Sequence, residues 1–104
     1  MNINETIKIA NIVDYQPDAV VSKTLIKKDK GAVTVFAFDK EQGLSDHTAP
    51  FDALVQIIDG KADIIIDGKS NITNVGELTI IPANVPHSLK AIENFKMMLV
   101  MIKE

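Results

Sequence analysis

The feature of this sequence that most constrains its fold is the repeated alternation of short β-forming runs with turn residues. Runs rich in Val, Ile, Thr and Phe are typical of β-strands, because β-branched and aromatic side chains pack well on a pleated surface. The pattern therefore predicts an all-β chain. The expected strands cover residues 20–26, 32–38, 53–58, 61–66, 70–75, 78–81, 88–92 and 95–102.

Two Asp-Gly pairs, Asp59-Gly60 and Asp67-Gly68, each lie between β-forming runs. Asp-Gly suits a two-residue type I′ turn, because both central residues of that turn need a positive φ. We therefore expect the strands on either side of each pair to be neighbours. The sequence predicts a three-stranded meander over residues 53–75.

The chain of 104 residues is about the size of one domain, and its hydrophobic fraction of 46% is enough to form a core. Residues 1–19 are predicted to form an N-terminal arm with one helical turn or an edge strand. Pro17 ends that segment, because proline cannot continue a helix or a strand ladder. Residues 20–104 form the β-domain.

Composition excludes several classes of function. The net charge is −3 and the eleven basic residues are all scattered lysines, so we expect no binding to nucleic acid. The absence of cysteine excludes disulfides and thiolate chemistry. We find no secretory signal and no apolar run long enough for a membrane span, so the expected location is the cytoplasm.

Two segments, residues 33–38 and 97–102, are apolar on both faces. A strand in a small sandwich normally shows one polar face to water, so these strands are expected to bury their second face. The cover is either the N-terminal segment or a second subunit, and we expect a homodimer. The alternative is that the Met-rich strand fills an irregular core.

The chain has two histidines, His47 and His87. A transition-metal site in one chain must therefore be built from these imidazoles and oxygen ligands, because cysteine is absent. The two positions are the centre of the functional question.

Two segments resemble the motifs of the cupin family. The first is residues 43–60, which contain His47, then Pro50, then Gly60, at the spacing of the first cupin motif. The second is residues 76–87, which begin with Gly76 and end with His87. The resemblance implies a cupin double-stranded β-helix, a jelly-roll barrel of two antiparallel sheets, spanning residues 20–104. Asn84 replaces a motif glycine, and asparagine tolerates the left-handed conformation.

The departures from the cupin pattern bear on function. The motif's second histidine is Ala49 here and its glutamate is Ala53, so the resemblance leaves His47 and His87 as ligands. Two imidazoles can bind a divalent transition metal weakly, whereas catalytic sites normally use three or more protein ligands. Asp52 supplies an oxygen only if its strand begins late or bulges, because on a regular strand it points the other way.

We therefore predict that the protein binds a small molecule in the barrel interior through His47 and His87, beside Phe51 and Asp52. One alternative is an enzyme, either a metal-dependent oxygenase or isomerase with a reduced ligand set or a metal-free acid–base catalyst. A second alternative is a structural or regulatory dimer with a vestigial pocket.

The walls of this pocket are predicted from strand alternation, which leaves open which set of side chains faces inward. Alternation from Ala53 places Gln56 on the outer face. The expected wall residues are Phe36 or Phe38, Phe51, Leu78 or Ile80, Leu89, Met97 and Leu99.

Overall fold

The structure, a computed structural model, describes residues 5–104. It contains one short 3-10 turn, η1 (Ile9–Asn11), and otherwise strands. No helix in this part of the chain is long and apolar enough to cross a membrane. The strands are β1 (Val20–Lys28), β2 (Gly31–Phe38), β3 (Gly43–His47), β4 (Asp52–Asp59), β5 (Lys61–Ile66), β6 (Lys69–Asn74), β7 (Leu78–Ile81), β8 (His87–Ala91) and β9 (Phe95–Ile102).

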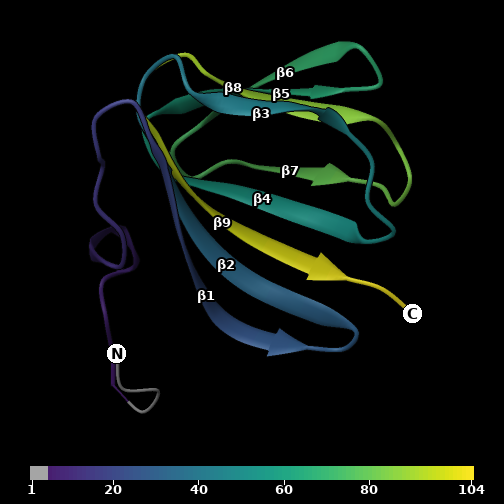
Figure 1. The fold of residues 1–104 in the computed structure, drawn as a ribbon, viewed down its shortest axis with the longest axis horizontal. Helices are drawn as coiled ribbons and strands as arrows, with labels where there is room; N and C mark the ends of the chain where they lie inside the picture. The colour runs from purple at the N-terminus through teal and green to yellow at the C-terminus, as the bar shows by residue number, and fades with distance from the viewer. Residues whose placement is uncertain (1–4) are drawn as a thin grey trace.

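The strands form two antiparallel sheets that face each other (Figure 1). The five-stranded sheet has the order β1-β2-β9-β4-β7, and the four-stranded sheet has the order β3-β8-β5-β6. From β2 onward the chain passes repeatedly from one sheet to the other, which is the topology of a jelly roll. The predicted fold class, an all-β barrel of two antiparallel sheets, is confirmed.

Every predicted strand is present, but β3 was not predicted. Its residues are mostly polar or glycine, with Ser45 and Asp46 exposed, and such residues are depleted in strands. The strand forms because Leu44 pairs with Leu89 of β8 at the edge of the four-stranded sheet. Tertiary pairing therefore overrides a weak local preference.

The predicted three-stranded meander is wrong. β5 and β6 form a hairpin in which Asp67 and Gly68 have φ values of 51° and 77°, as a type I′ turn requires. At Asp59-Gly60 only the glycine has a positive φ, and β4 belongs to the other sheet. An Asp-Gly pair indicates a reversal of the chain, but it does not say whether the next strand stays in the same sheet.

The main core lies between the two sheets. β4 alternates as expected, with Val55 and Ile57 1% exposed and Gln56 on the outer face, opposite Met98 of β9. The rings of Phe38 and Phe95 stack with centroids 4.4 Å apart. Burial of side chains of this size stabilises a fold by about 1.5–3 kcal/mol each.

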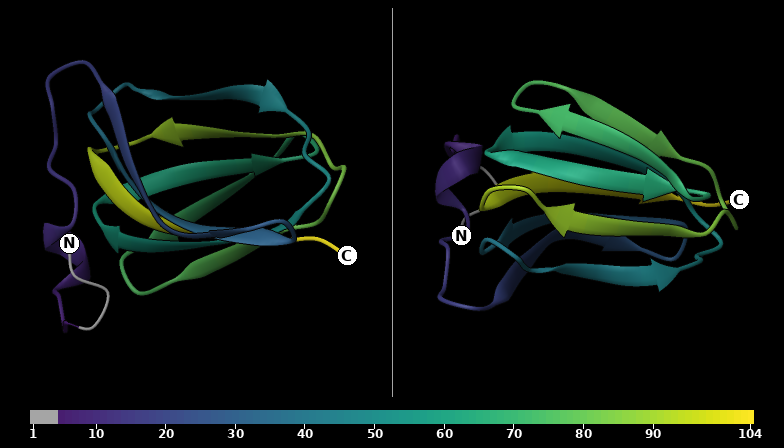
Figure 2. Two further views of the ribbon diagram at one scale, coloured as in Figure 1. Left: turned by 60° about the horizontal axis from the view of Figure 1, so that its bottom comes forward. Right: turned by 90° about the horizontal axis from the view of Figure 1, so that it is seen from above.

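The N-terminal segment covers part of the outer face of the five-stranded sheet. Val13 is buried in a cluster with Val35 and Ala37 of β2. The Tyr15 hydroxyl donates a hydrogen bond of 2.5 Å to Asp59 Oδ2. The segment thus supplies the second face of β2, which was one of the two expected covers. It lies at one end of the barrel, and the C-terminus lies at the opposite end (Figure 2).

No other segment of residues 5–104 covers the rest of this outer face. We call Leu54 of β4, Leu78 and Ile80 of β7, and Val100 and Ile102 of β9 the outer patch. Leu78, Ile80 and Ile102 are 52%, 57% and 61% exposed. The three strands are adjacent in the sheet, so the patch is continuous. Contiguous exposed apolar surface is typical of an interaction site.

Candidate ligand pocket

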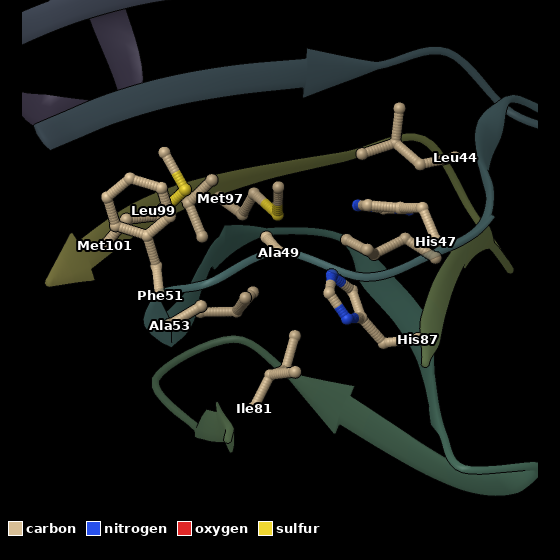
Figure 3. Close-up of a pocket in the computed structure, with 12 residues that line it drawn as sticks. Leu44, His47, Ala49, Phe51, Ala53, Ile81, His87, Met97, Leu99 and Met101 are labelled. Carbon is tan, nitrogen blue, oxygen red and sulfur yellow. The ribbon is translucent and has the colours of Figure 1, made fainter. Parts of the chain in front are cut away.

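A cavity of about 60 Å³ lies between the two sheets (Figure 3). Its lining comes from β3, β4, β7, β8 and β9, and from the segment that connects β3 to β4. Two lining side chains are polar, and both are histidines. The lining residues are Leu44, His47, Ala49, Phe51, Ala53, Val55, Ile81, His87, Leu89, Met97, Leu99 and Met101.

The two histidines meet because β3 pairs with β8. His47 and His87 are direct partners in the register, and their ring centroids lie 4.3 Å apart at an interplanar angle of 59°. Asn84, in the turn before β8, has a φ of 65°. This confirms the predicted left-handed conformation. Its N–H donates to the carbonyl oxygen of Ala49 at 2.8 Å, which fastens the connecting segment over the cavity.

Main-chain hydrogen bonds determine which ring nitrogen of each imidazole carries the proton. His47 Nδ1 lies 2.7 Å from the carbonyl oxygen of Ser45, and His87 Nδ1 lies 2.9 Å from that of Val85. A carbonyl oxygen only accepts, so each Nδ1 must carry the proton. In the neutral ring, Nε2 is then a lone-pair acceptor. Figure 3 shows both rings pointing into the cavity.

The donor set does not fit a resident catalytic metal ion. Ala49 and Ala53 line the cavity at the positions where the cupin motif carries a histidine and a glutamate. Residues 5–104 contain no group of three or more His, Asp or Glu side chains that could hold a metal. Two imidazoles fall short of the three protein ligands of an ordinary catalytic site. No step of a mechanism is therefore derived through a metal.

The placement of Asp52 among the ligand-contacting residues is corrected. Asp52 does not line the cavity, and its Oδ1 accepts a hydrogen bond of 2.9 Å from the backbone N–H of Ala83. The carboxylate lies in a separate open groove beside Pro50 and Lys103. The physical reason is strand alternation: Ala53 faces inward, so its neighbour Asp52 faces outward.

Several wall residues are where the sequence placed them, and others are not. Phe51, Leu89, Met97 and Leu99 line the cavity as predicted. Leu78 and Ile80 do not, because β7 turns the opposite set of side chains inward, and Ile81 lines the cavity instead. Phe36 and Phe38 are not in the lining either, and they belong to the neighbouring core.

Four lining residues were not among the predicted wall residues: Leu44, Val55, Ile81 and Met101. Alternation along β9 was a signal for Met101, because it follows Met97 and Leu99 at intervals of two. Leu44 had no such signal, since its strand was not expected.

Comparison with known proteins agrees with this architecture. The sequence profile of the cupin domain family matches residues 34–103. A conserved protein of unknown function from Streptococcus pyogenes is 34% identical, with a TM-score of 0.96, over 100% of this chain and 91% of that chain. A cupin superfamily protein from Desulfitobacterium hafniense, 20% identical, shares the fold with a TM-score of 0.93 over 100% of this chain and 95% of that chain.

A third relative is longer than this chain. The cupin 2 conserved barrel domain protein from Leptotrichia buccalis is 42% identical, with a TM-score of 0.88, over 90% of this chain. The match covers 46% of that protein, so this chain spans about half its length. No curated protein matches the chain significantly. The profile match covers more than half of the chain, and with the two-sheet barrel it shows that the protein belongs to the cupin domain family.

Proposed function

We propose that the protein binds a small, mainly apolar molecule in the barrel cavity through His47 and His87, with the ligand's hydroxyl group donating its one proton to Nε2 of either imidazole. The observation that carries the proposal is the pair of neighbouring imidazoles whose Nδ1 protons are both used by main-chain carbonyls. Two acceptors on one side of an otherwise apolar cavity favour a ligand that brings a hydrogen-bond donor.

The chemistry of the lining limits the ligand class. Ten of the twelve lining residues are apolar, so they favour a hydrocarbon or aromatic body. An alcohol or phenol satisfies both requirements, because its hydroxyl donates to an imidazole nitrogen while its carbon atoms contact Met97, Leu99 and Ile81. The two histidines are the polar residues of the lining. The proposal concerns binding and includes no reaction.

The test compares p-cresol with toluene, which has the same ring and methyl group but no hydroxyl. Chemical-shift perturbation in NMR spectra is measured for the wild type, for His47→Ala and for His87→Ala. We expect p-cresol to bind about tenfold more tightly than toluene, because leaving a buried acceptor unpaired costs about 1–3 kcal/mol. Each histidine variant should lower that preference, because it removes one of the two acceptors. Asp52→Asn is the matched control and should keep it.

Equal binding of p-cresol and toluene by the wild type overturns the proposal. A metal analysis of the purified protein provides a second test. One tightly bound transition ion per chain, lost on His87→Ala, would show that the imidazoles serve a metal rather than a hydroxyl group.

A second copy of this chain is the proposed cover of the outer patch. Leu54, Ile80 and Val100 carry no charge, and a chain with a net charge of −3 meets its own copy most easily through a neutral surface. The same patch on both partners makes the contact self-complementary. The cytoplasmic location stays a prediction from the sequence.

A further inference from the structure

The two imidazoles of the cavity offer two separate acceptors at one place. Nδ1 of His47 donates to the carbonyl oxygen of Ser45, and Nδ1 of His87 donates to that of Val85. Within residues 5–104, these are the hydrogen bonds of the two rings, so each Nε2 keeps its lone pair for a ligand. Figure 3 shows both rings on the same side of the cavity. A group bound beside them therefore meets both acceptors.

The proposed hydroxyl group uses only one of these acceptors. A hydroxyl carries one proton, so the second Nε2 stays unpaired or needs a water molecule. The other ten side chains of the lining are apolar and supply no donor. An acceptor left unpaired away from water lowers affinity. A head group with two donor hydrogens therefore satisfies the pair of imidazoles more completely.

A primary amino group has the geometry for this task. Its two N–H bonds diverge from one nitrogen atom, so hydrogen bonds of ordinary length reach two acceptors roughly 5 Å apart. His47 and His87 are direct partners in the pairing of β3 and β8, and their ring centroids are 4.3 Å apart. This spacing brings both rings within reach of one amino group.

The apolar lining selects an amino group without a charge. The lining, which is drawn from residues 5–104, holds no Asp or Glu side chain that could pair with an ammonium ion. Burial of an unpaired charge in apolar surroundings is costly. An amino group bonded to an aromatic ring stays neutral near pH 7, because its lone pair is delocalised into the ring, whereas an alkylamine is protonated. The cavity therefore favours aromatic amines over alkylamines.

We propose that the same cavity accepts a second class of ligand, neutral aromatic primary amines, whose amino group bridges the two imidazoles. One N–H donates to Nε2 of His47 and the other to Nε2 of His87. The inference rests on the proposed function, because it uses the same cavity and the same acceptors. The two classes differ in one respect: an amine needs both histidines at once, whereas a hydroxyl group needs either one.

The test compares p-toluidine, p-cresol and toluene, which share the ring and the methyl group and carry two, one and no donor hydrogens. Dissociation constants are measured by NMR titration for the wild type, His47→Ala and Asp52→Asn. Titrations at about pH 8 stay above the usual titration range of imidazole, so Nε2 keeps its lone pair. 4-Methylbenzylamine, which is protonated at this pH, tests the requirement for a neutral group.

The choice of variants follows from burial and position. His47 is exposed, so His47→Ala should leave the fold intact. Asp52 lies outside the cavity, which makes Asp52→Asn the matched control. His87→Ala, checked for folding by circular dichroism, is the second test of the bridge. Every affinity is compared with that of toluene for the same variant, which corrects for a change in the shape of the cavity.

We expect the wild type to bind p-toluidine and p-cresol more tightly than toluene. His47→Ala should weaken the binding of p-toluidine about tenfold, because one N–H loses its acceptor. The same variant should weaken p-cresol by no more than about twofold, because its proton then goes to His87. A folded His87→Ala should give the same pattern, and Asp52→Asn should change neither affinity.

Equal weakening of p-toluidine and p-cresol by His47→Ala overturns the inference. Binding of 4-methylbenzylamine that is tighter than that of p-toluidine also overturns it, and so does a failure of p-toluidine to bind. In each case, a wild type that prefers p-cresol to toluene leaves the proposed function standing. If p-cresol binds no more tightly than toluene, the proposed function fails, and the response of p-toluidine to His47→Ala still decides the inference.

Discussion

His47 and His87 face each other across the pairing of β3 and β8, with ring centroids 4.3 Å apart, but they differ in burial. His87 is 8% exposed, whereas His47 is exposed at the edge strand. In each ring, Nδ1 donates to the carbonyl oxygen of the residue two positions earlier in the chain, Ser45 for His47 and Val85 for His87. The two side chains therefore present the same chemistry to a ligand while contributing differently to the fold.

This difference predicts unequal effects on stability. His87→Ala should lower the free energy of unfolding by about 2 kcal/mol, because it removes a buried ring and the hydrogen bond to Val85. His47→Ala should change it by less than about 0.5 kcal/mol, as is usual for exposed positions. Urea unfolding monitored by circular dichroism measures both values. Equal losses in the two variants would contradict the assignment of burial.

Gly60 and Gly68 form a matched pair for testing the connection from β4 to β5, which links the two sheets. Both have a positive φ, 75° and 77°, but a Cβ on Gly60 would lie 1.9 Å from the carbonyl oxygen of Asn94. A Cβ on Gly68 meets nothing within 4 Å. Gly68→Ala should cost about 1 kcal/mol for the left-handed conformation, and Gly60→Ala should cost more than about 3 kcal/mol.

The midpoints of urea unfolding measure the two losses, provided that the dependence of the unfolding free energy on urea is the same in both variants. Similar midpoints would contradict the close approach of Gly60 to the carbonyl oxygen of Asn94.

Tyr15 predicts a dependence of stability on high pH. Burial raises the pKa of Tyr15 well above its ordinary value of 10, and the hydrogen bond to Asp59 and the charges of Asp59 and Glu93 raise it further. The folded state therefore favours the neutral phenol. This contribution to stability is complete below pH 10 and is lost as the pH rises from 10 through the raised pKa.

The measurement compares wild type with Tyr15→Phe, which does not titrate. At pH 7 the wild type should be more stable by about 1 kcal/mol, since the phenol donates to a partly exposed carboxylate. The difference should decrease between pH 10 and pH 11. A constant difference across this range would refute the role of Asp59.

The outer patch predicts a homodimer. Ile80→Lys should convert a dimer into a monomer, because a charge at the centre of an apolar contact must be desolvated without a partner. Ile72→Lys on β6 is the control, since Ile72 is 51% exposed but lies in the other sheet. Sedimentation velocity at about 50 µM distinguishes the two states. A monomeric wild type, or a dimer that survives Ile80→Lys, would rule out this interface.

Local sequence patterns were enough to locate most of the strands and the candidate histidines. Period-two alternation placed Val55 and Ile57 on one face of β4 and Gln56 on the other, and the structure confirms this. The spacing of the cupin motifs marked His47 and His87, which the fold brings together. These features depend on residues close together in the chain, so the sequence expresses them directly.

The tertiary structure alone decided which strands are neighbours and which faces point inward. Asp59-Gly60 marked a reversal, but the sheet that each side joins depends on pairing between β4 and β9, about forty residues apart. The direction of Asp52 and the meeting of Phe51 and Met101 in the cavity lining likewise depend on register between distant strands. Alternation determines that two faces differ, whereas packing of the sheets determines which face is the interior.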